Sequence, residues 1–564
     1  MDFEKKIITA IEKTGIKNAK DLLEIPPHRE MGDFALPCFK LAKEQKKKPF
    51  KIAEKIMKKI ILPKEFEKTE VKGPYLNFFI KDEIYTKNTI EEILEKKEKY
   101  GLKKPEGKPI IVEYCQANPM KSFHIGHVRN ICLGESIAKL LEANKTKVIR
   151  INYAGDVGPH VSKTIYAYQN IVKEKEPTEI IAKGKWIGEL YATGAKEVKE
   201  NPELEEKMRE MVVELEKGNP KLKKDWIKLR QISLDYFDYI YKELNIKFDK
   251  IILESQVEKE GIAIAKKLEK EGIAIKDEGA LLIDLTKYNL DKFLILKSDG
   301  AALYSSKDLG LAKMKKQELK AEKTYNVVGS EQKFYFQQLI KTIDLLNQKK
   351  KEYCETVHVS YELVRLEGGK MASREGKVIT FSELLEKIHE KTYNETKKRH
   401  ENWSQEKIEN NSKELALTAL KFGMLCQDKN KSIIFNWEKA TTLEGETGPF
   451  VQYALARANS ILKKAGKKIK ITNFKPEHKK EKELISLIAN YKNKVNEANT
   501  TLSPHKIAYY LIELAAEFNS FYHEVPVLKT NENTQARRLA LVEAITQVLK
   551  NGLTLLNITP IEEM

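Results

Sequence analysis

One stretch constrains the fold of this chain more than any other: a short apolar run that leads through a polar loop into an amphipathic segment. Residues 110–115 are mostly apolar and rich in β-branched side chains, and apolar residues recur at helical spacing between 126 and 141. The loop between them contains Asn118 and Pro119, both of which disfavour a helix. The stretch therefore predicts a strand, a loop and a helix, in that order.

Two histidines, His124 and His127, stand where this predicted helix begins. A helix N-terminus presents backbone N–H groups and the positive end of the macrodipole, so it favours an anion such as a phosphate. Gly126 lies between the histidines and lets a flat ring or a phosphate approach the backbone closely. Two histidines at such a place are more often ordinary surface or core-edge residues, so the motif needs support from its context.

Length and composition indicate a large globular protein. The 564 residues are enough for roughly three or four domains. Hydrophobic residues make up 41% and charged residues 33%, and we find no apolar run long enough to span a bilayer. We expect no export signal, and five widely spaced cysteines without a C-x-x-C pair predict a reducing cytoplasm and no structural zinc. The net charge of +18 favours a polyanionic partner, although a genome rich in lysine codons would give the same surplus.

The context of the histidines resembles a known family. His124-Ile125-Gly126-His127 after an apolar strand resembles the HIGH signature of class I aminoacyl-tRNA synthetases, and residues 113–135 with 151–156 resemble the arginyl-tRNA synthetases in particular. The resemblance implies a multidomain α/β protein with an N-terminal α+β tRNA-binding domain (1–100), a Rossmann-like catalytic domain with a parallel sheet (106–395) and a C-terminal all-α anticodon-binding bundle (396–564). Within the catalytic domain it implies a helical connective insertion at about 160–240 and a mobile loop at 368–380. We expect further strands at 147–154, 280–285, 293–297 and 324–328.

A pocket for arginine has a clear chemical requirement. A guanidinium presents five donors in a planar fork, so a selective pocket needs ionised carboxylates and gains from an aromatic wall. The resemblance assigns this pocket to Glu113, Asn118, Tyr304, Asp308 and Gln332, with Asp308 on the guanidinium. Considered alone, Glu113 at a strand end would more often be a structural salt-bridge residue.

The resemblance also assigns the residues that would act on ATP. His124, Gly126, His127, Lys370, Met371 and Ser373 would bind ATP, and His124, His127, Lys121 and Lys370 would be catalytic. Ala372 and Ser373 depart from the family's mobile-loop motif, and Lys121 stands where many arginyl enzymes carry a compensating lysine. We expect Mg²⁺ to arrive with ATP, with no metal held by protein ligands. Val157 and Tyr335 replace a tryptophan and a histidine that are usual in the family.

The function implied is that of an arginine–tRNA ligase. It would make arginyl-adenylate and pyrophosphate from L-arginine and ATP, and then transfer arginine to the 3′-terminal adenosine of tRNA(Arg). Residues 444–457 resemble the entry to the anticodon-binding bundle, where Tyr453 and Arg457 would contact tRNA. We expect a cytoplasmic monomer without a membrane partner.

Two alternatives belong to other classes. A different H-x-G-H nucleotidyltransferase would lack the set Glu113, Tyr304, Asp308 and Gln332 and a tRNA-sized C-terminal bundle. A noncatalytic RNA-binding relative would keep the basic domains and tend to lose the histidines, which are present here.

Overall fold

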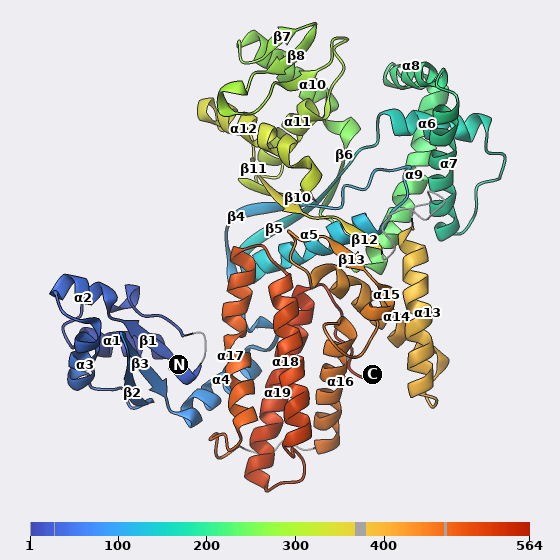
Figure 1. The fold of residues 1–564 in the computed structure, drawn as a ribbon. Helices are drawn as coiled ribbons and strands as arrows, with labels where there is room; N and C mark the ends of the chain where they lie inside the picture. The colour runs from blue at the N-terminus through green and yellow to red at the C-terminus, as the bar shows by residue number, and fades with distance from the viewer. Residues whose placement is uncertain (1, 27–28, 367–378, 467–470) are drawn as a thin grey trace.

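The computed structural model describes residues 2–26, 29–366, 379–466 and 471–564 (Figure 1). The N-terminal module contains α1 (Phe3–Glu12), α2 (Phe39–Gln45) and α3 (Pro49–Lys59), with β1 (Phe34–Pro37), β2 (Phe66–Lys72) and β3 (Tyr75–Ile80) in an antiparallel sheet of order β1-β3-β2. Ile52 and Ile56 lie one helical turn apart on α3 and are buried with Phe78 of β3 in a core of the module's own. Figure 1 shows this module standing to one side of the remaining chain.

A parallel sheet lies at the centre of the chain. Its strands are β4 (Lys103–Glu113), β5 (Asn144–Ala154), β6 (Lys250–Leu253), β10 (Lys323–Gly329) and β11 (Glu355–Tyr361), in the order β11-β10-β4-β5-β6. Helix α5 (Ile125–Ala143) connects β4 to β5, which confirms the predicted strand, loop and helix. The strand order reverses between β4 and β10, and the carboxyl ends of strands at such a reversal form a crevice for ligands.

Helices fill the connection between β5 and β6. They are α6 (Pro159–Asn170), α7 (Ile180–Glu200), α8 (Leu204–Glu216) and α9 (Pro220–Glu243), and they enclose a small core that includes Trp186, Leu190 and Leu229. Figure 1 shows α9 running from this helical group back towards the central sheet.

The expected strands at 280–285 and 293–297 exist, but they are not part of the parallel sheet. They are β8 (Ala280–Ile283) and β9 (Phe293–Leu296), which pair antiparallel with each other, and β8 also pairs with β7 (Ile275–Asp277). Helix α10 (Glu254–Lys270) leads into this small sheet, and α11 (Tyr304–Gln317) and α12 (Lys333–Lys349) follow it. Ile264, Leu309 and Phe336 from these helices are buried in one core with β8 and β9.

The C-terminal part is a helical bundle. It contains α13 (Phe381–Arg399), α14 (Gln405–Leu425), α15 (Trp437–Ala440), α16 (Gly448–Ala465), α17 (Lys479–Thr500), α18 (His505–Glu524) and α19 (Glu532–Leu555), with the parallel pair β12 (Val364–Leu366) and β13 (Ile433–Phe435) at its entrance. Helix α4 (Asp82–Lys96) joins the N-terminal module to this bundle. The ring of Tyr100, just beyond α4, stacks on Tyr491 of α17 with centroids 5.9 Å apart.

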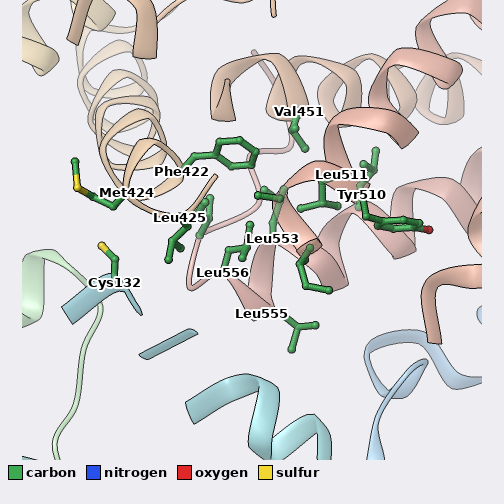
Figure 2. Packing of buried hydrophobic residues seen from close by; sticks show 14 of the residues in the cluster. Cys132, Phe422, Met424, Leu425, Val451, Tyr510, Leu511, Leu553, Leu555 and Leu556 are labelled. Atoms are coloured by element: carbon green, nitrogen blue, oxygen red, sulfur yellow. The ribbon is translucent and has the colours of Figure 1, made fainter. Parts of the chain in front are cut away.

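The central parallel sheet and the bundle share one hydrophobic core. Cys132 of α5 lies in the same buried cluster as Leu425 of α14, Val451 of α16 and Leu553 of α19 (Figure 2). Figure 1 shows α5 between the sheet and the bundle, so the helix that begins at the two histidines is buried from both sides. No helix within the described ranges is long and apolar enough to cross a membrane.

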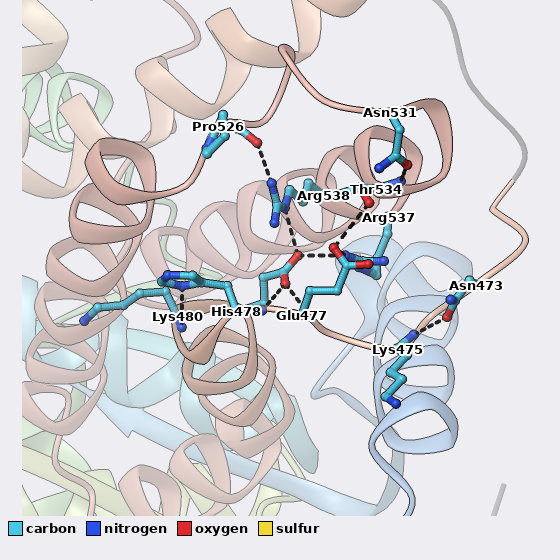
Figure 3. Close-up of polar contacts among 11 residues, drawn as sticks. Asn473, Lys475, Glu477, His478, Lys480, Pro526, Asn531, Thr534, Arg537 and Arg538 are labelled. Atoms are coloured by element: carbon cyan, nitrogen blue, oxygen red, sulfur yellow. Dashed lines mark hydrogen bonds and ion pairs between the residues drawn. The ribbon is translucent and has the colours of Figure 1, made fainter.

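A buried ion network closes the far end of the bundle. Glu481 at the start of α17 accepts a bond from Arg538 Nε of α19 at 3.0 Å and also pairs with Arg537. Arg538 Nη1 donates to the carbonyl of Pro526 at 2.8 Å (Figure 3). The network therefore connects α17 and α19 to the segment that follows α18.

Candidate active site

The two histidines cap the first turn of α5. His124 Nδ1 accepts a bond from the Gly126 N–H at 3.1 Å, and His127 Nδ1 accepts one from the His124 N–H at 3.2 Å. A neutral imidazole whose Nδ1 is an acceptor carries its proton on Nε2. Burial lowers the pKa of His124 to about 4 and that of His127 well below its ordinary value. At neutral pH the stacked rings, with centroids 3.9 Å apart, therefore each present a neutral Nε2–H donor.

This capping changes what the turn can offer to a phosphate. The sequence predicted backbone N–H groups as the anion donors, but the Gly126 N–H is bonded to the His124 ring. The imidazole Nε2–H groups are the donors that the two rings leave for a ligand, because both Nδ1 atoms are occupied by backbone bonds.

Lys121 supplies a positive charge beside the histidines. Burial lowers its pKa, and so does the nearby Lys163; Lys121 in turn lowers the pKa of both histidines. Its Nζ lies 5.4 Å from the centre of the Tyr191 ring, and no carboxylate of the described residues forms an ion pair with it. A half-buried ammonium with an aromatic neighbour and no anionic partner is suited to an anionic ligand.

The segment that begins at residue 379 is hydrogen-bonded to the residues that lead into α5, Phe123 and His124. Thr380 forms a β-bridge with His124, and the Phe381 N–H donates to the Phe123 carbonyl at 2.8 Å. Thr380 Oγ1 also caps α13 by accepting from the Glu383 N–H. The predicted Lys370, Met371 and Ser373 lie outside the described residues, but the chain that follows them is anchored beside His124.

Asp308 provides a carboxylate with no cationic partner in the described part of the chain. Its Oδ2 accepts a hydrogen bond from the Tyr335 hydroxyl at 2.5 Å. Burial raises the pKa of Asp308 to about 7, and the negative charges of Glu113 and Glu254 act in the same direction. Asp308 is thus a carboxylate in an acidic environment, which favours a cationic ligand.

The nearby lysines are already paired with other carboxylates. Lys315 Nζ lies 2.6 Å from Glu113 Oε2, and both side chains are almost fully buried. Lys307 Nζ lies 2.9 Å from Glu254 Oε1. Glu113 therefore sits in the kind of salt bridge that a strand-end glutamate would adopt on its own, while Asp308 does not.

Tyr153, which the sequence did not single out, lies close to the same acidic group. Its hydroxyl is buried and has no hydrogen-bond partner among the described residues. Burial raises its pKa far above the ordinary value, and Asp308, Glu254 and Glu113 raise it further. A buried hydroxyl without a partner carries a desolvation cost that a donor or acceptor of a ligand would offset. Its position within the family-like stretch 151–156 was the signal that could have identified it.

The remaining predicted pocket residues occupy different environments. Tyr304 begins α11, one helical turn before Asp308, and is 63% exposed, so its ring is accessible to a ligand. Asn118 Oδ1 accepts the Gly155 N–H at 2.9 Å, which holds the loop after β4 to the turn after β5. Gln332 is exposed at the start of α12 and does not contact Asp308 through any hydrogen bond in the described structure.

Tyr453 and Arg457 lie together in a groove of the bundle. The Arg457 guanidinium lies 4.7 Å from the ring centres of both Tyr453 and Tyr522. It also donates to Asn519 at 2.6 Å and to the Tyr453 hydroxyl at 3.1 Å. The groove has a volume of about 440 Å³ and includes Pro526, whose carbonyl accepts from Arg538. Sequence reasoning missed Tyr522, because its helical spacing is equally that of a core residue.

Within the described ranges, no group of His, Cys, Asp and Glu side chains is arranged to hold a metal ion.

The class of protein follows from this arrangement. A parallel sheet with an HIGH turn at its first strand–helix connection, followed by a helical bundle, is the plan of a class I aminoacyl-tRNA synthetase. The chain matches the family models of the tRNA synthetases class I (R) catalytic domain over residues 89–437, the DALR anticodon binding domain over 451–564 and the arginyl tRNA synthetase N-terminal domain over 1–80. The chain belongs to the arginyl-tRNA synthetase family. Membership implies ATP and tRNA as substrates.

Known proteins are similar over the whole length. The chain is 35% identical to the arginine–tRNA ligase of Clostridium acetobutylicum, with 100% of both chains covered, and 35% identical to that of Clostridium botulinum strain Loch Maree. Among solved structures, Thermus thermophilus arginyl-tRNA synthetase superposes with a TM-score of 0.82 at 27% identity, covering 100% of this chain and 99% of the other. The Plasmodium falciparum enzyme shares the fold, with a TM-score of 0.78 at 20% identity and 99% of each chain covered.

Proposed function

We propose that this chain ligates L-arginine to tRNA(Arg) in two steps. The arginine carboxylate first attacks the α-phosphate of ATP, giving arginyl-adenylate and pyrophosphate. A hydroxyl of the 3′-terminal adenosine of the tRNA then attacks the adenylate and releases AMP. The observation that carries this proposal is a buried carboxylate, Asp308, that has no cationic partner among the described residues and lies in one site with a lysine and two Nε2–H donors.

The turn after β5 connects the two halves of this site. Tyr153, near the end of β5, is close enough to Asp308 for the carboxylate to raise its pKa. Gly155, in the turn that follows, is hydrogen-bonded to the side chains of Asn118 and His160. Burial lowers the pKa of His160 to about 4, and the adjacent Lys121 lowers it further. An arginine whose guanidinium met Asp308 would therefore extend its carboxylate towards Lys121 and the histidine turn.

Asp308 binds the guanidinium and Tyr304 covers its flat face. An ionised carboxylate accepts from two guanidinium N–H groups in the same plane, which gives both affinity and geometric selection. Asn118 and Gln332 complete the pocket around the α-amino and carboxylate groups. Glu113 lies on the acidic side of the pocket, and its salt bridge engages the Lys315 ammonium.

The ATP half of the reaction depends on donors that meet developing negative charge. In-line transfer at the α-phosphate builds charge on the phosphoryl oxygens and on pyrophosphate, and preorganised donors stabilise it. We assign this role to the Nε2–H groups of His124 and His127 and to Lys121, with Gly126 leaving space for the nucleotide. Lys370, Met371 and Ser373 complete the ATP contacts, and Mg²⁺ accompanies the ATP phosphates.

For tRNA, we assign Tyr453 and Arg457 to the anticodon side. Arg457 presents a guanidinium held between two aromatic rings, an arrangement suited to unpaired bases and phosphates. We also propose that the chain works as a monomer in the cytoplasm, where its five unpaired cysteines would stay reduced.

The test is ATP consumption by the purified chain with each of the twenty amino acids, with and without tRNA. We expect aminoacyl-tRNA to form only with arginine and with tRNA(Arg) present. Consumption of ATP without arginine or tRNA would indicate another nucleotidyltransferase. Binding of tRNA without any ATP consumption would indicate a noncatalytic RNA-binding protein.

A further inference from the structure

One face of helix α9 contacts the turn that follows β5. Arg230 Nη1 pairs with Asp156 Oδ2 at 2.7 Å, and the Asp156 side chain is fully buried. Trp226, one helical turn earlier, donates from its indole nitrogen to the Asp156 carbonyl at 2.8 Å. These two contacts fix the N-terminal half of α9 to the turn after β5.

The same face continues to the loop that follows β4. Ser233 Oγ accepts the Met120 backbone N–H at 2.7 Å, although the two residues are 113 positions apart. Further along, the Tyr241 hydroxyl accepts from Asn152 at 2.9 Å and lies 3.4 Å from Cys115 Sγ. Helix α9 therefore reaches the segments after both β4 and β5.

A third contact of α9 reaches the segment beside the histidines. The Tyr236 and Ser382 hydroxyls lie 2.9 Å apart, and Ser382 follows the residues that bridge to Phe123 and His124. One helix of the insertion thus contacts the loop after β4, the turn after β5 and the segment beside the histidines.

The contact between Ser233 and Met120 supports a strained turn. The Lys121 N–H donates to the Asn118 carbonyl at 3.2 Å, with Pro119 second and Met120 third in the turn. Met120 has φ +68°, and glycine or asparagine usually occupies the third position of a turn with such a backbone. A residue held there costs energy and persists only where its surroundings determine it.

Burial makes the Ser233 hydroxyl hard to replace. Ser233 is 1% exposed and Met120 is 0% exposed, so water would not readily reach the Met120 N–H if the hydroxyl were lost. The turn would then relax towards an ordinary conformation. Lys121 is the last residue of that turn, so relaxation would move its ammonium relative to the histidines.

We propose that Ser233 is a positioning residue for adenylate formation: through the Met120 N–H it fixes the turn that places Lys121 beside the α-phosphate. This inference rests on the role proposed for Lys121. Ser233 bonds the third residue of the turn, whereas the side chain of Asn118, the first residue, is held separately by the Gly155 N–H at 2.9 Å. Loss of the Ser233 hydroxyl should therefore displace Lys121 more than Asn118 and lower the rate of the chemical step more than it weakens arginine binding.

The experiment is a double-mutant cycle on the full chain, followed by pyrophosphate exchange with tRNA present. Ser233→Ala and Lys121→Ala are measured singly and together, with Ser136→Ala as the matched control. Ser136 is also a fully buried helical serine, but its hydroxyl has no hydrogen-bond partner to lose in the described structure. We expect Ser233→Ala to lower kcat about tenfold with KM for arginine within about twofold, consistent with the loss of one buried hydrogen bond.

The cycle separates positioning from a general structural effect. If Ser233 acts through Lys121, Ser233→Ala should lower kcat less than about twofold in the Lys121→Ala background. An equal loss in both backgrounds, an unchanged kcat, or a raised KM for arginine with kcat intact would overturn the inference. If Lys121→Ala alone leaves the rate unchanged, the role proposed for Lys121 is wrong. The proposal that Ser233 acts by positioning Lys121 would then be wrong as well.

A second pair guards against a variant that does not fold. Ser233→Thr and Ser233→Val have nearly equal volumes and differ by one hydroxyl, so they impose the same crowding. We expect the threonine variant to be at least fivefold faster than the valine variant at equal thermal stability. Equal rates for the two would contradict the proposal. Complete loss of arginine-dependent exchange in the unmodified chain would contradict the proposed function instead.

Discussion

The Tyr335 hydroxyl donates a hydrogen bond of 2.5 Å to Asp308 Oδ2, so one oxygen of this carboxylate is held from the side of α12. The bond favours the ionised form of Asp308, while burial opposes it and raises the pKa to about 7. Tyr335 stands where the family commonly has histidine. Its phenol thus provides the donor that a histidine could provide, and it keeps the carboxylate oriented.

The raised pKa of Asp308 predicts a pH dependence of arginine binding. An acid with a raised pKa keeps its proton to higher pH, and the guanidinium requires the ionised form, so binding must release a proton near pH 7. With a pKa of about 7, the Kd for arginine should rise about tenfold between pH 8 and pH 6. Titration calorimetry in buffers of different ionisation enthalpy measures both the Kd and the proton released.

Two variants test the origin of that dependence. Asp308→Asn should bind arginine weakly and with no pH dependence in this range. Tyr335→Phe removes a bond to the charged form and should move the midpoint to higher pH. A flat profile in the unmodified chain would exclude Asp308 as the titrating group.

Lys121→Ala should slow adenylate formation and leave arginine binding nearly unchanged. The reason is that Lys121 lies beside the histidines and not beside Asp308. Adding Ser373→Lys, which restores the second lysine of the mobile-loop motif, should recover part of the rate. Pyrophosphate exchange and calorimetry measure the two effects separately, and a rate unchanged in Lys121→Ala would refute this role.

Arg457→Met should raise the KM for tRNA at least about tenfold without changing the KM for arginine. The substitution removes a cation held between Tyr453 and Tyr522 and should reduce the salt dependence of tRNA binding by about one phosphate contact. Arg399→Met, which removes an exposed arginine on α13, is the control. If both variants bind tRNA alike, the groove around Arg457 is not the tRNA contact.

A fragment that ends before Leu443 should fail to fold into a stable catalytic domain. It would lack the residues of α16 to α19 that complete the core around Cys132 of α5, including Val451 and Leu553. Exposing such a core removes burial that contributes about 25 cal/mol per Å². Circular dichroism and thermal unfolding of the fragment measure this, and a cooperative transition like that of the full chain would contradict the shared core.

The strand, loop and helix around the histidines could be predicted, because burial against a sheet imposes periodic apolar positions on a local stretch. The resemblance named Tyr304 and Asp308 as candidates, but it did not predict that both lie on one helix, α11. The sheet of β7, β8 and β9 could not be separated from the parallel sheet, because short apolar strands carry no signal of their partners.

Contacts between distant residues gave no sequence signal at all. Glu113 and Lys315 form a buried ion pair; a salt bridge was the ordinary expectation for Glu113, but nothing in the sequence indicated Lys315 as its partner. Likewise, nothing in the sequence indicates that the Ser233 hydroxyl accepts a hydrogen bond from the Met120 N–H. Such pairs depend on which backbones meet in three dimensions, and a single sequence does not record that.

The most direct test of the account is the preference for arginine over citrulline in the unmodified chain and in Asp308→Asn, measured by pyrophosphate exchange with tRNA present. Breaking one side of a buried charged pair costs ~3–5 kcal/mol, so kcat/KM for arginine should fall by roughly two to four powers of ten. Citrulline is neutral and offers an oxygen acceptor, so it should lose much less. Asp299→Asn, an exposed site in the turn before α11, should change neither value. We expect the preference for arginine to collapse in Asp308→Asn. A preference that survives would place the specificity carboxylate elsewhere, with Glu113 the next candidate.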